Sequence, residues 1–126
     1  DGLIVQLPLP SHINEMTITE RTVPFVKKLR ETHKKTPILL VEDRSFTNTS
    51  FFPNRKSRHQ KSRAALKKSY TELIDAGLGN LYYLDGDHLL GHDGEAATDG
   101  SHPSDLGMLR YADAYEPVLR SILKQF

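Results

Sequence analysis

The 126-residue sequence has no cysteine, no apolar run long enough to cross a membrane and almost no net charge. Without cysteine the chain can form neither a disulfide nor a thiolate metal site. A membrane-spanning helix needs about 20 consecutive apolar residues, so we expect no membrane partner. The formal net charge is +1, which gives no indication of a nucleic-acid partner. The length suits a single domain that covers residues 1–126.

The basic residues are unevenly placed along the chain. No aspartate or glutamate lies between residues 44 and 71, and the basic side chains in the middle of this stretch are Arg55, Lys56, Arg58, Lys61, Arg63, Lys67 and Lys68. We expect them on the solvated face of a helix, and contact with a phosphate or an acidic substrate is the alternative. No aromatic residue is interleaved with these charges, which argues against binding of a nucleic acid.

Three short apolar runs alternate with three longer segments of helical periodicity. Continuous apolarity is typical of strands that are covered on both faces, and strands that alternate with helices form parallel sheets. The expected strands are residues 3–7, 38–41 and 81–84, and the expected helices are about 15–35, 58–76 and 104–123. The fold class is therefore α/β, in the order β-α-β-α-β-α. Three strands leave two free edges, and free edges pair with other chains, so we expect self-association.

Single residues predict where the helices begin, bend and end. Asn14 or Thr17 caps the first helix, and Pro24 lies inside the pattern of that helix, where it predicts a kink or a later start. Gly77 follows the second helix at a position that favours left-handed backbone. Pro117 is expected to restart the last helix, whose final residues are expected to be buried.

The segment after the third strand carries the most chemistry. In open α/β sheets, sites form beyond the C-terminal ends of the strands, and here that region contains Asp99-Gly100-Ser101-His102. A turn of this length can fold the Asp99 carboxylate back onto His102 Nδ1. The carboxylate would then fix the tautomer and leave Nε2 as a general base. The alternative is an ordinary loop histidine beside an aspartate that caps a helix.

From about residue 19 to residue 123 the chain resembles the SGNH, or GDSL-type, hydrolases. The matching stretches include "TPILLVEDRSFTN" and, most specifically, "DGSHPSDLG" around Asp99 and His102. The resemblance implies a flavodoxin-like, Rossmann-like sandwich of three layers, a small acyl-ester substrate and neither a metal nor a cofactor. It also implies that Asp99 orients His102, the base of a catalytic triad. The nucleophilic serine of that family, in a Gly-Asp-Ser-like turn, has no recognisable counterpart here.

Residues 1–15 resemble a different family. "DGLIVQLPLPSHINE" is similar to the methylenetetrahydrofolate dehydrogenase/cyclohydrolases, in which Gln6 and Pro8 would line the folate site. That family also needs a Tyr-x-x-x-Lys helix and a dinucleotide-binding domain, and neither is found, so we expect no folate chemistry. A buried strand with a rigid proline exit is the alternative. Two resemblances that meet near residues 14–18, and a first residue Asp1 in place of Met, suggest an engineered chimera whose residues 16–126 come from an SGNH hydrolase.

A metal site is the main competing interpretation of the loop after the third strand. Its possible ligands are Asp85, Asp87, His88, His92, Asp93, Glu95, Asp99 and His102. Their spacing matches neither a zinc motif nor an EF-hand loop, so we favour a hydrated active-site loop that holds no metal. The remaining histidines, His12, His33 and His59, are expected at the surface.

Two functions follow from these patterns. We favour a non-catalytic domain, engineered or truncated, that derives from an SGNH acyl-ester hydrolase and keeps Asp99 and His102 without the serine. The alternative is an active or split esterase whose serine is supplied elsewhere. Members of a triad act as a unit, so a base without its nucleophile should be a very weak catalyst.

Overall fold

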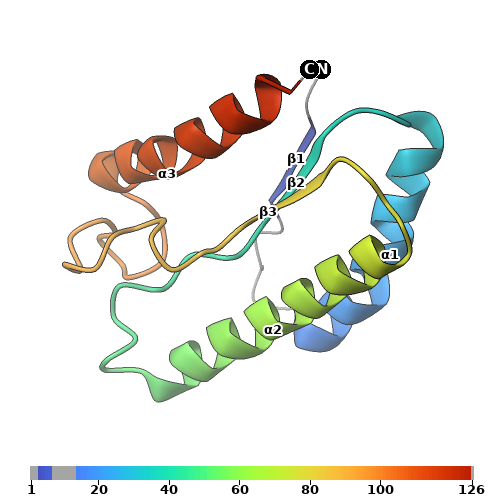
Figure 1. Ribbon diagram of the computed structural model, residues 1–126. Coiled ribbons are helices and arrows are strands. Elements are labelled where there is room, and N and C mark those ends of the chain that lie inside the picture. Colours follow the sequence, from blue (N-terminus) through green and yellow to red (C-terminus); the bar gives the residue numbers. More distant parts are fainter. Residues whose placement is uncertain (1–2, 7–13, 126) are drawn as a thin grey trace.

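The computed structural model describes residues 3–6 and 14–125. Three strands and three helices alternate along this part of the chain and form three layers, with α3 on one face of the sheet and α1 and α2 on the other (Figure 1). In chain order the elements are β1 (Leu3–Gln6), α1 (Glu15–Thr32), β2 (Ile38–Val41), α2 (Pro53–Asp75), β3 (Leu81–Leu84) and α3 (Asp105–Leu123). The expected α/β class and element order are confirmed.

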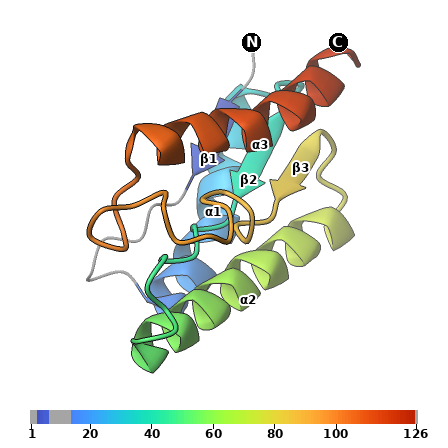
Figure 2. The same ribbon diagram turned by 90° about the vertical axis from the view of Figure 1, so that its left-hand side faces the viewer.

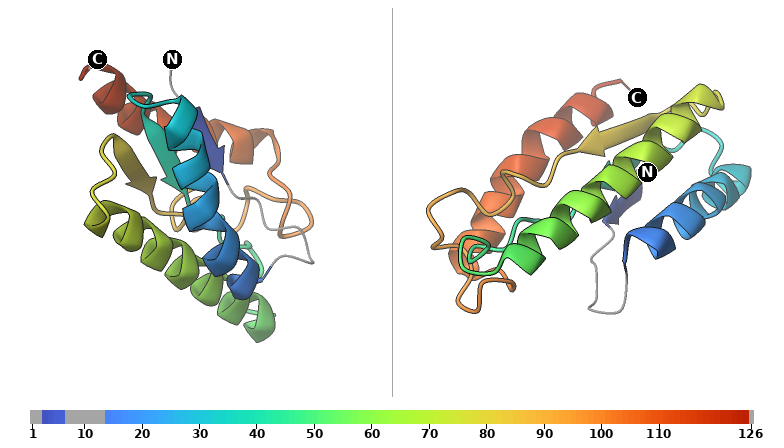
Figure 3. Two further views of the ribbon diagram at one scale, coloured as in Figure 1. Left: turned by 90° about the vertical axis from the view of Figure 1, so that its right-hand side faces the viewer. Right: turned by 90° about the horizontal axis from the view of Figure 1, so that it is seen from below.

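The strands form one parallel sheet in the order β1-β2-β3. All four residues of the central strand β2 are buried, as its continuous apolarity predicts. Because the strands are parallel, the loops that follow β2 and β3 meet at one end of the sheet (Figure 2). The opposite end carries the connections that lead into the strands (Figure 3, left).

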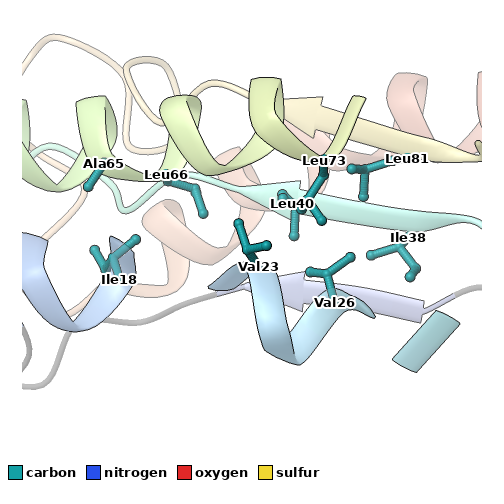
Figure 4. Close-up of a cluster of buried hydrophobic side chains, with 9 residues drawn as sticks. All are labelled: Ile18, Val23, Val26, Ile38, Leu40, Ala65, Leu66, Leu73 and Leu81. Atoms are coloured by element: carbon teal, nitrogen blue, oxygen red, sulfur yellow. The ribbon is translucent and has the colours of Figure 1, made fainter. Parts of the chain in front are cut away.

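The core lies on both faces of the sheet, since alternate residues of a strand point in opposite directions. On one face, Ile38 and Leu40 pack against α1 and α2, which lie side by side (Figure 3, right; Figure 4). On the other face, Leu39 and Val41 pack against α3. Burial of each such side chain contributes about 1.5–3 kcal/mol. The helices therefore stay attached to the strands whose ends carry the site.

Helix α1 begins at its first predicted cap. Asn14 Oδ1 accepts the backbone N–H of Thr17 at 3.1 Å, so Asn14 is the N-cap and Thr17 lies inside the helix. The helix begins before Pro24 and continues through it, so the prediction that Pro24 delays the start of the helix is wrong. Pro24 lies on the exposed side of the helix, where its ring does not disturb the packing against the sheet.

Helix α2 is longer than its sequence pattern indicates. It begins at Pro53 rather than near Arg58, because proline suits the first turn of a helix, where its missing N–H costs no hydrogen bond. Its end is as predicted, and Gly77 follows in left-handed backbone with φ +80°. The apolar residues of this helix recur at helical spacing, which predicts that Ile74 is buried beside Leu73, but Ile74 is 42% exposed.

Helix α3 is continuous and amphipathic. Ser104 caps it and accepts the N–H of Gly107 at 3.3 Å, and the helix passes through Pro117, so the predicted restart there is wrong. Ile122 is buried, but Leu123, the last residue of the helix, is 58% exposed. Within the described residues, no helix has the length and apolarity needed to span a membrane.

Candidate functional site

A tight turn brings Asp99 and His102 together where α3 begins. Asp99 Oδ2 lies 2.5 Å from His102 Nδ1, and Asp99 Oδ1 accepts the backbone N–H groups of Ser101 and His102 at 2.8 and 2.7 Å. Gly100 allows this turn because its φ is +81°, a backbone conformation that favours glycine. The contact expected from the three-residue spacing is therefore present.

The hydrogen bonds on Asp99 decide the protonation of the pair. The His102 side chain, and then the backbone N–H groups of His102 and Ser101, hold the pKa of the Asp99 carboxyl well below its usual range. An ionised carboxylate can only accept hydrogen bonds, so His102 Nδ1 carries a proton and donates it. The second ring nitrogen, Nε2, is left as an acceptor in the neutral imidazole. The His102 side chain is 81% exposed, so the imidazole is open to solvent.

The loop after β2 forms hydrogen bonds with the turn that carries Asp99 and His102. Arg44 Nε donates to the carbonyl oxygen of Ser101 at 2.7 Å, and Arg44 Nη2 donates to Ser101 Oγ at 3.0 Å. The backbone N–H of Thr47 donates to the carbonyl oxygen of Gly100 at 2.9 Å. Asn48 fills the space beside Gly100, where a Cβ atom would collide with its side chain. The segments that follow β2 and β3 are therefore joined at the site.

Buried charges anchor this loop to the rest of the molecule. Glu42 accepts hydrogen bonds from Tyr83 Oη at 2.6 Å and from the N–H of Gly86 at 2.9 Å. Arg63 of α2 donates to the carbonyl oxygen of Asp43 through Nη2, at 3.1 Å. Burial raises the pKa of the Asp43 carboxyl, and the positive charge of Arg44 opposes that shift. Together these contacts tie the C-terminal ends of β2 and β3 to α2.

Part of the basic stretch therefore faces inward. The Arg63 side chain is only 15% exposed, which corrects for this residue the expectation of a solvated face. The sequence gives one sign that charged residues lie at the site. The segment "EDR", residues 42–44, follows a fully apolar strand and so begins at the end of the sheet where sites form. The partners of Arg44 and Arg63 come from distant segments, and the local pattern does not indicate them.

His59 is buried, and its expected place at the surface is wrong. It is 3% exposed, Nε2 accepts the N–H of Phe46 at 3.1 Å, and the ring stacks edge-on against Phe46. His59 lies seven residues, or two helical turns, before the buried Leu66, so both share the face of α2 that packs inward. His33 is exposed as expected, and His12 lies outside the described residues.

No serine among the described residues forms a hydrogen bond with His102 Nε2. Five of the serine hydroxyl groups have other partners: Ser62 and Ser69 donate to carbonyl oxygens within α2, while Ser45, Ser101 and Ser104 accept from Arg63, Arg44 and Gly107. Within the part of the chain described here, the Asp99–His102 pair has no serine hydroxyl in contact with the second imidazole nitrogen.

The acidic and imidazole side chains between residues 85 and 102 do not gather around one point. Asp93 is paired with Arg110, whose Nη1 lies 2.6 Å from Asp93 Oδ1. His88 and His92 contact each other through Nδ1 and Nε2 at 2.8 Å. Among residues 3–6 and 14–125, no group of three or more His, Asp or Glu side chains is placed to hold a metal ion.

The fold and the site together define a class of protein: a parallel α/β domain with an Asp–His pair at the C-terminal ends of its strands. The profile of the GDSL-like lipase/acylhydrolase family matches residues 3–120. The chain belongs to this family. No curated protein matches the sequence.

Two solved structures have the same fold. A protein described as a GDSL-like lipase, from Bacteroides ovatus ATCC 8483, is 33% identical with a TM-score of 0.92 over 98% of this chain. The salicylyl-acyltransferase SsfX3 from a tetracycline biosynthetic pathway is 20% identical with a TM-score of 0.74 over 97% of this chain. The present chain spans only 36% and 38% of the lengths of those two chains.

The comparisons give no support for a second parent at the N-terminus. The family match begins at residue 3 and runs across the junction expected near residues 14–18, and so does the likeness to the Bacteroides protein. Gln6 is the last residue of β1 and pairs with Val41, while Pro8 lies outside the described residues. A single family accounts for both segments.

Proposed function

We propose that this chain supplies the general base, His102, and its orienting carboxylate, Asp99, for hydrolysis of an acyl ester. The observation that carries the proposal is the contact of 2.5 Å between Asp99 Oδ2 and His102 Nδ1, beside an imidazole that is open to solvent. Membership of the GDSL-like lipase/acylhydrolase family supports acyl esters as the substrate class.

In this proposal His102 Nε2 accepts the proton of a serine hydroxyl while the serine oxygen attacks the acyl carbon. Asp99 stabilises the imidazolium that forms. The imidazolium then returns the proton to the departing alkoxide, and a water molecule repeats the sequence to release the acid. Each step needs the ring to stay in the tautomer that Asp99 fixes, so replacing the carboxylate should impair the base without removing it.

The nucleophilic serine, we propose, comes from outside the described residues. Ser45, Ser62, Ser69, Ser101 and Ser104 have the other partners given above. The chain on its own should then act as a weak, imidazole-type catalyst. An esterase that is complete within residues 14–125 is the alternative, and the labelling experiment below separates the two.

The first test measures the base. Hydrolysis of p-nitrophenyl acetate should be first order in ester, without saturation. His102→Ala should lower the rate more than His33→Ala, a matched loss of an exposed imidazole, and Asp99→Asn should lower it by a smaller factor. If His102→Ala has no greater effect than His33→Ala, the proposed role of His102 is refuted.

The second test locates the nucleophile. A fluorophosphonate probe labels serine nucleophiles covalently, and peptide mapping identifies the residue. We expect no label on any serine between residues 14 and 125. A labelled serine in that range, together with saturable turnover that His102→Ala abolishes, would establish the complete esterase and overturn the proposal of an outside nucleophile.

A further inference from the structure

Two consecutive peptide groups of the Asp99–His102 turn are held at both ends. Asp99 Oδ1 accepts the N–H groups of Ser101 and His102. The carbonyl oxygens of the same two peptide groups belong to Gly100 and Ser101, and these accept from Thr47 N–H at 2.9 Å and Arg44 Nε at 2.7 Å. A peptide group is planar, so holding its N–H and its oxygen fixes its orientation. The direction in which the His102 side chain leaves the backbone is fixed with it.

Arg44 provides the side-chain half of this clamp. Its side chain is 14% exposed, and Nη1 lies 2.8 Å from Oδ1 of Asp43, whose own side chain is 5% exposed. Nη2 reaches Ser101 Oγ at 3.0 Å. A guanidinium presents these donors in one rigid plane. The contact with Asp43 therefore orients the guanidinium plane, and the other two nitrogens, Nε and Nη2, hold Ser101.

The position of Arg44 in the sequence explains how it reaches the turn. It lies just after β2, and Ser101 follows β3 by a long loop, so the two are 57 residues apart in the chain. Arg63 of α2 also holds the Arg44 segment, because its Nη2 donates to Asp43 O at 3.1 Å and to Ser45 Oγ at 3.0 Å. The clamp is thus built on an anchored loop.

We propose that Arg44 is a positioning residue for the Asp99–His102 pair: by holding Ser101 it keeps the His102 imidazole in line with the Asp99 carboxylate. The inference rests on the proposed function for its catalytic meaning, since the pair matters for catalysis only if His102 is the base. The geometric claim itself can be tested without any substrate.

Arg30 offers a matched control. It also donates to backbone carbonyl oxygens, those of His33, Thr36, Gly79 and Asn80, at 2.7 to 3.3 Å. Its partners lie in the connections that lead into β2 and β3, at the end of the sheet opposite the site. Arg30→Gln therefore removes a comparable set of structural hydrogen bonds without touching the turn.

The readout is the imidazole of His102, observed by 15N NMR of the neutral ring. In the wild-type protein Nδ1 should carry the proton and Nε2 should not. In Arg44→Gln the Nδ1–H form should cease to dominate, and the Asp99 carboxyl, followed by 13C NMR, should titrate at higher pH than in wild type. Arg44→Lys keeps the charge but not the planar fork and should give the same change. Arg30→Gln should leave both signals as in wild type.

A wild-type tautomer in Arg44→Gln, or an equal change in Arg30→Gln, would overturn the proposal. If the Arg44 variants do not fold, Ser101→Ala replaces them, since it removes only the contact to Arg44 Nη2, and it should weaken the Nδ1–H signal in part; an unchanged signal would then count against the proposal. The outcome is separable from the proposed function. A changed tautomer without His102-dependent ester hydrolysis removes the function and leaves the clamp, whereas hydrolysis with an unchanged tautomer removes only the clamp.

Discussion

His59 should make the folded protein sensitive to mild acid. Burial, followed by the positive charges of Arg63 and Arg44 and of two further arginines, lowers the pKa of the His59 imidazole from 6.5 to about 4. Its Nδ1 has no hydrogen-bond partner and lies 3.8 Å from Asp43 Oδ2. The unfolded chain binds a proton at this residue below pH 6.5, whereas the folded chain does so only below about pH 4.

The sign and size of the effect follow from this difference. Between these two values the unfolded state binds more protons than the native state, so stability falls as the pH falls. Each pH unit within the window costs about 1.4 kcal/mol. With the pKa lowered from 6.5 to about 4, the free energy of unfolding at pH 4 is about 3 kcal/mol lower than at neutral pH. An ordinary domain has a free energy of unfolding of about 5–15 kcal/mol, so this loss is substantial.

The assay is urea unfolding at pH 7, 6, 5 and 4.5, followed by far-UV circular dichroism because the chain has no tryptophan. His59→Gln keeps an acceptor for the N–H of Phe46 but cannot titrate, so the free energy of unfolding of this variant should change much less over this range. His33→Gln removes an exposed imidazole and is the control, in which the wild-type slope should remain.

Parallel curves for the wild-type protein and His59→Gln would refute the reasoning. Such a result would mean that the imidazole is protonated in the native state across the window. The negative charge of Asp43, 3.8 Å away, would then outweigh burial and the surrounding arginines.

Three other predictions concern packing and the sheet edges. Leu73 is fully buried, so Leu73→Ala should lower the free energy of unfolding in urea by about 2–5 kcal/mol. Leu123 is 58% exposed, so Leu123→Ala should lower it by less than about 0.5 kcal/mol. Equal losses would contradict the described core. Gly107→Ala should lower the melting temperature although alanine favours helices, because the added methyl group meets Ala96 O and Pro103 Cβ; a higher melting temperature would refute this. Neither β1 nor β3 has another strand on its outer side among the described residues, so light scattering should show a mass that rises with concentration above 14.3 kDa, and a constant mass would count against self-association.

The fold could be predicted because its signals are local. Ile38 to Val41 form a short, continuous apolar run, which is typical of a strand covered on both faces. Gly77 marks the end of α2 for the same kind of local reason. The sequence does not mark the start of α2, because the first turn carries no acidic residue and the N-cap, Phe52, makes no side-chain hydrogen bond. Histidine is polar, and only its spacing of seven residues from the buried Leu66 places His59 on the inward face of the helix.

The site was predictable only as far as its contacts are local. Asp99 and His102 are three residues apart, so a turn suffices to join them. Arg44 and Ser101 meet only when the loops after β2 and β3 come together, and no pattern in either loop names the other. Arg63 looks like one more member of a basic stretch, although its side chain is turned inward.

The buried charges around Asp43 explain why these distant contacts are stable. Removing a carboxylate and a guanidinium from water is costly, and the cost is offset only when the pair is well oriented and its remaining donors are used. The Arg44 guanidinium meets this condition because it donates hydrogen bonds to both Asp43 and Ser101. If either Asp43 or Arg44 were removed, the other charge would be left buried and unpaired, which would lower the free energy of unfolding by about 3–5 kcal/mol. The Arg44 segment therefore has one favourable arrangement, and that arrangement is the one that holds the turn of Asp99 and His102.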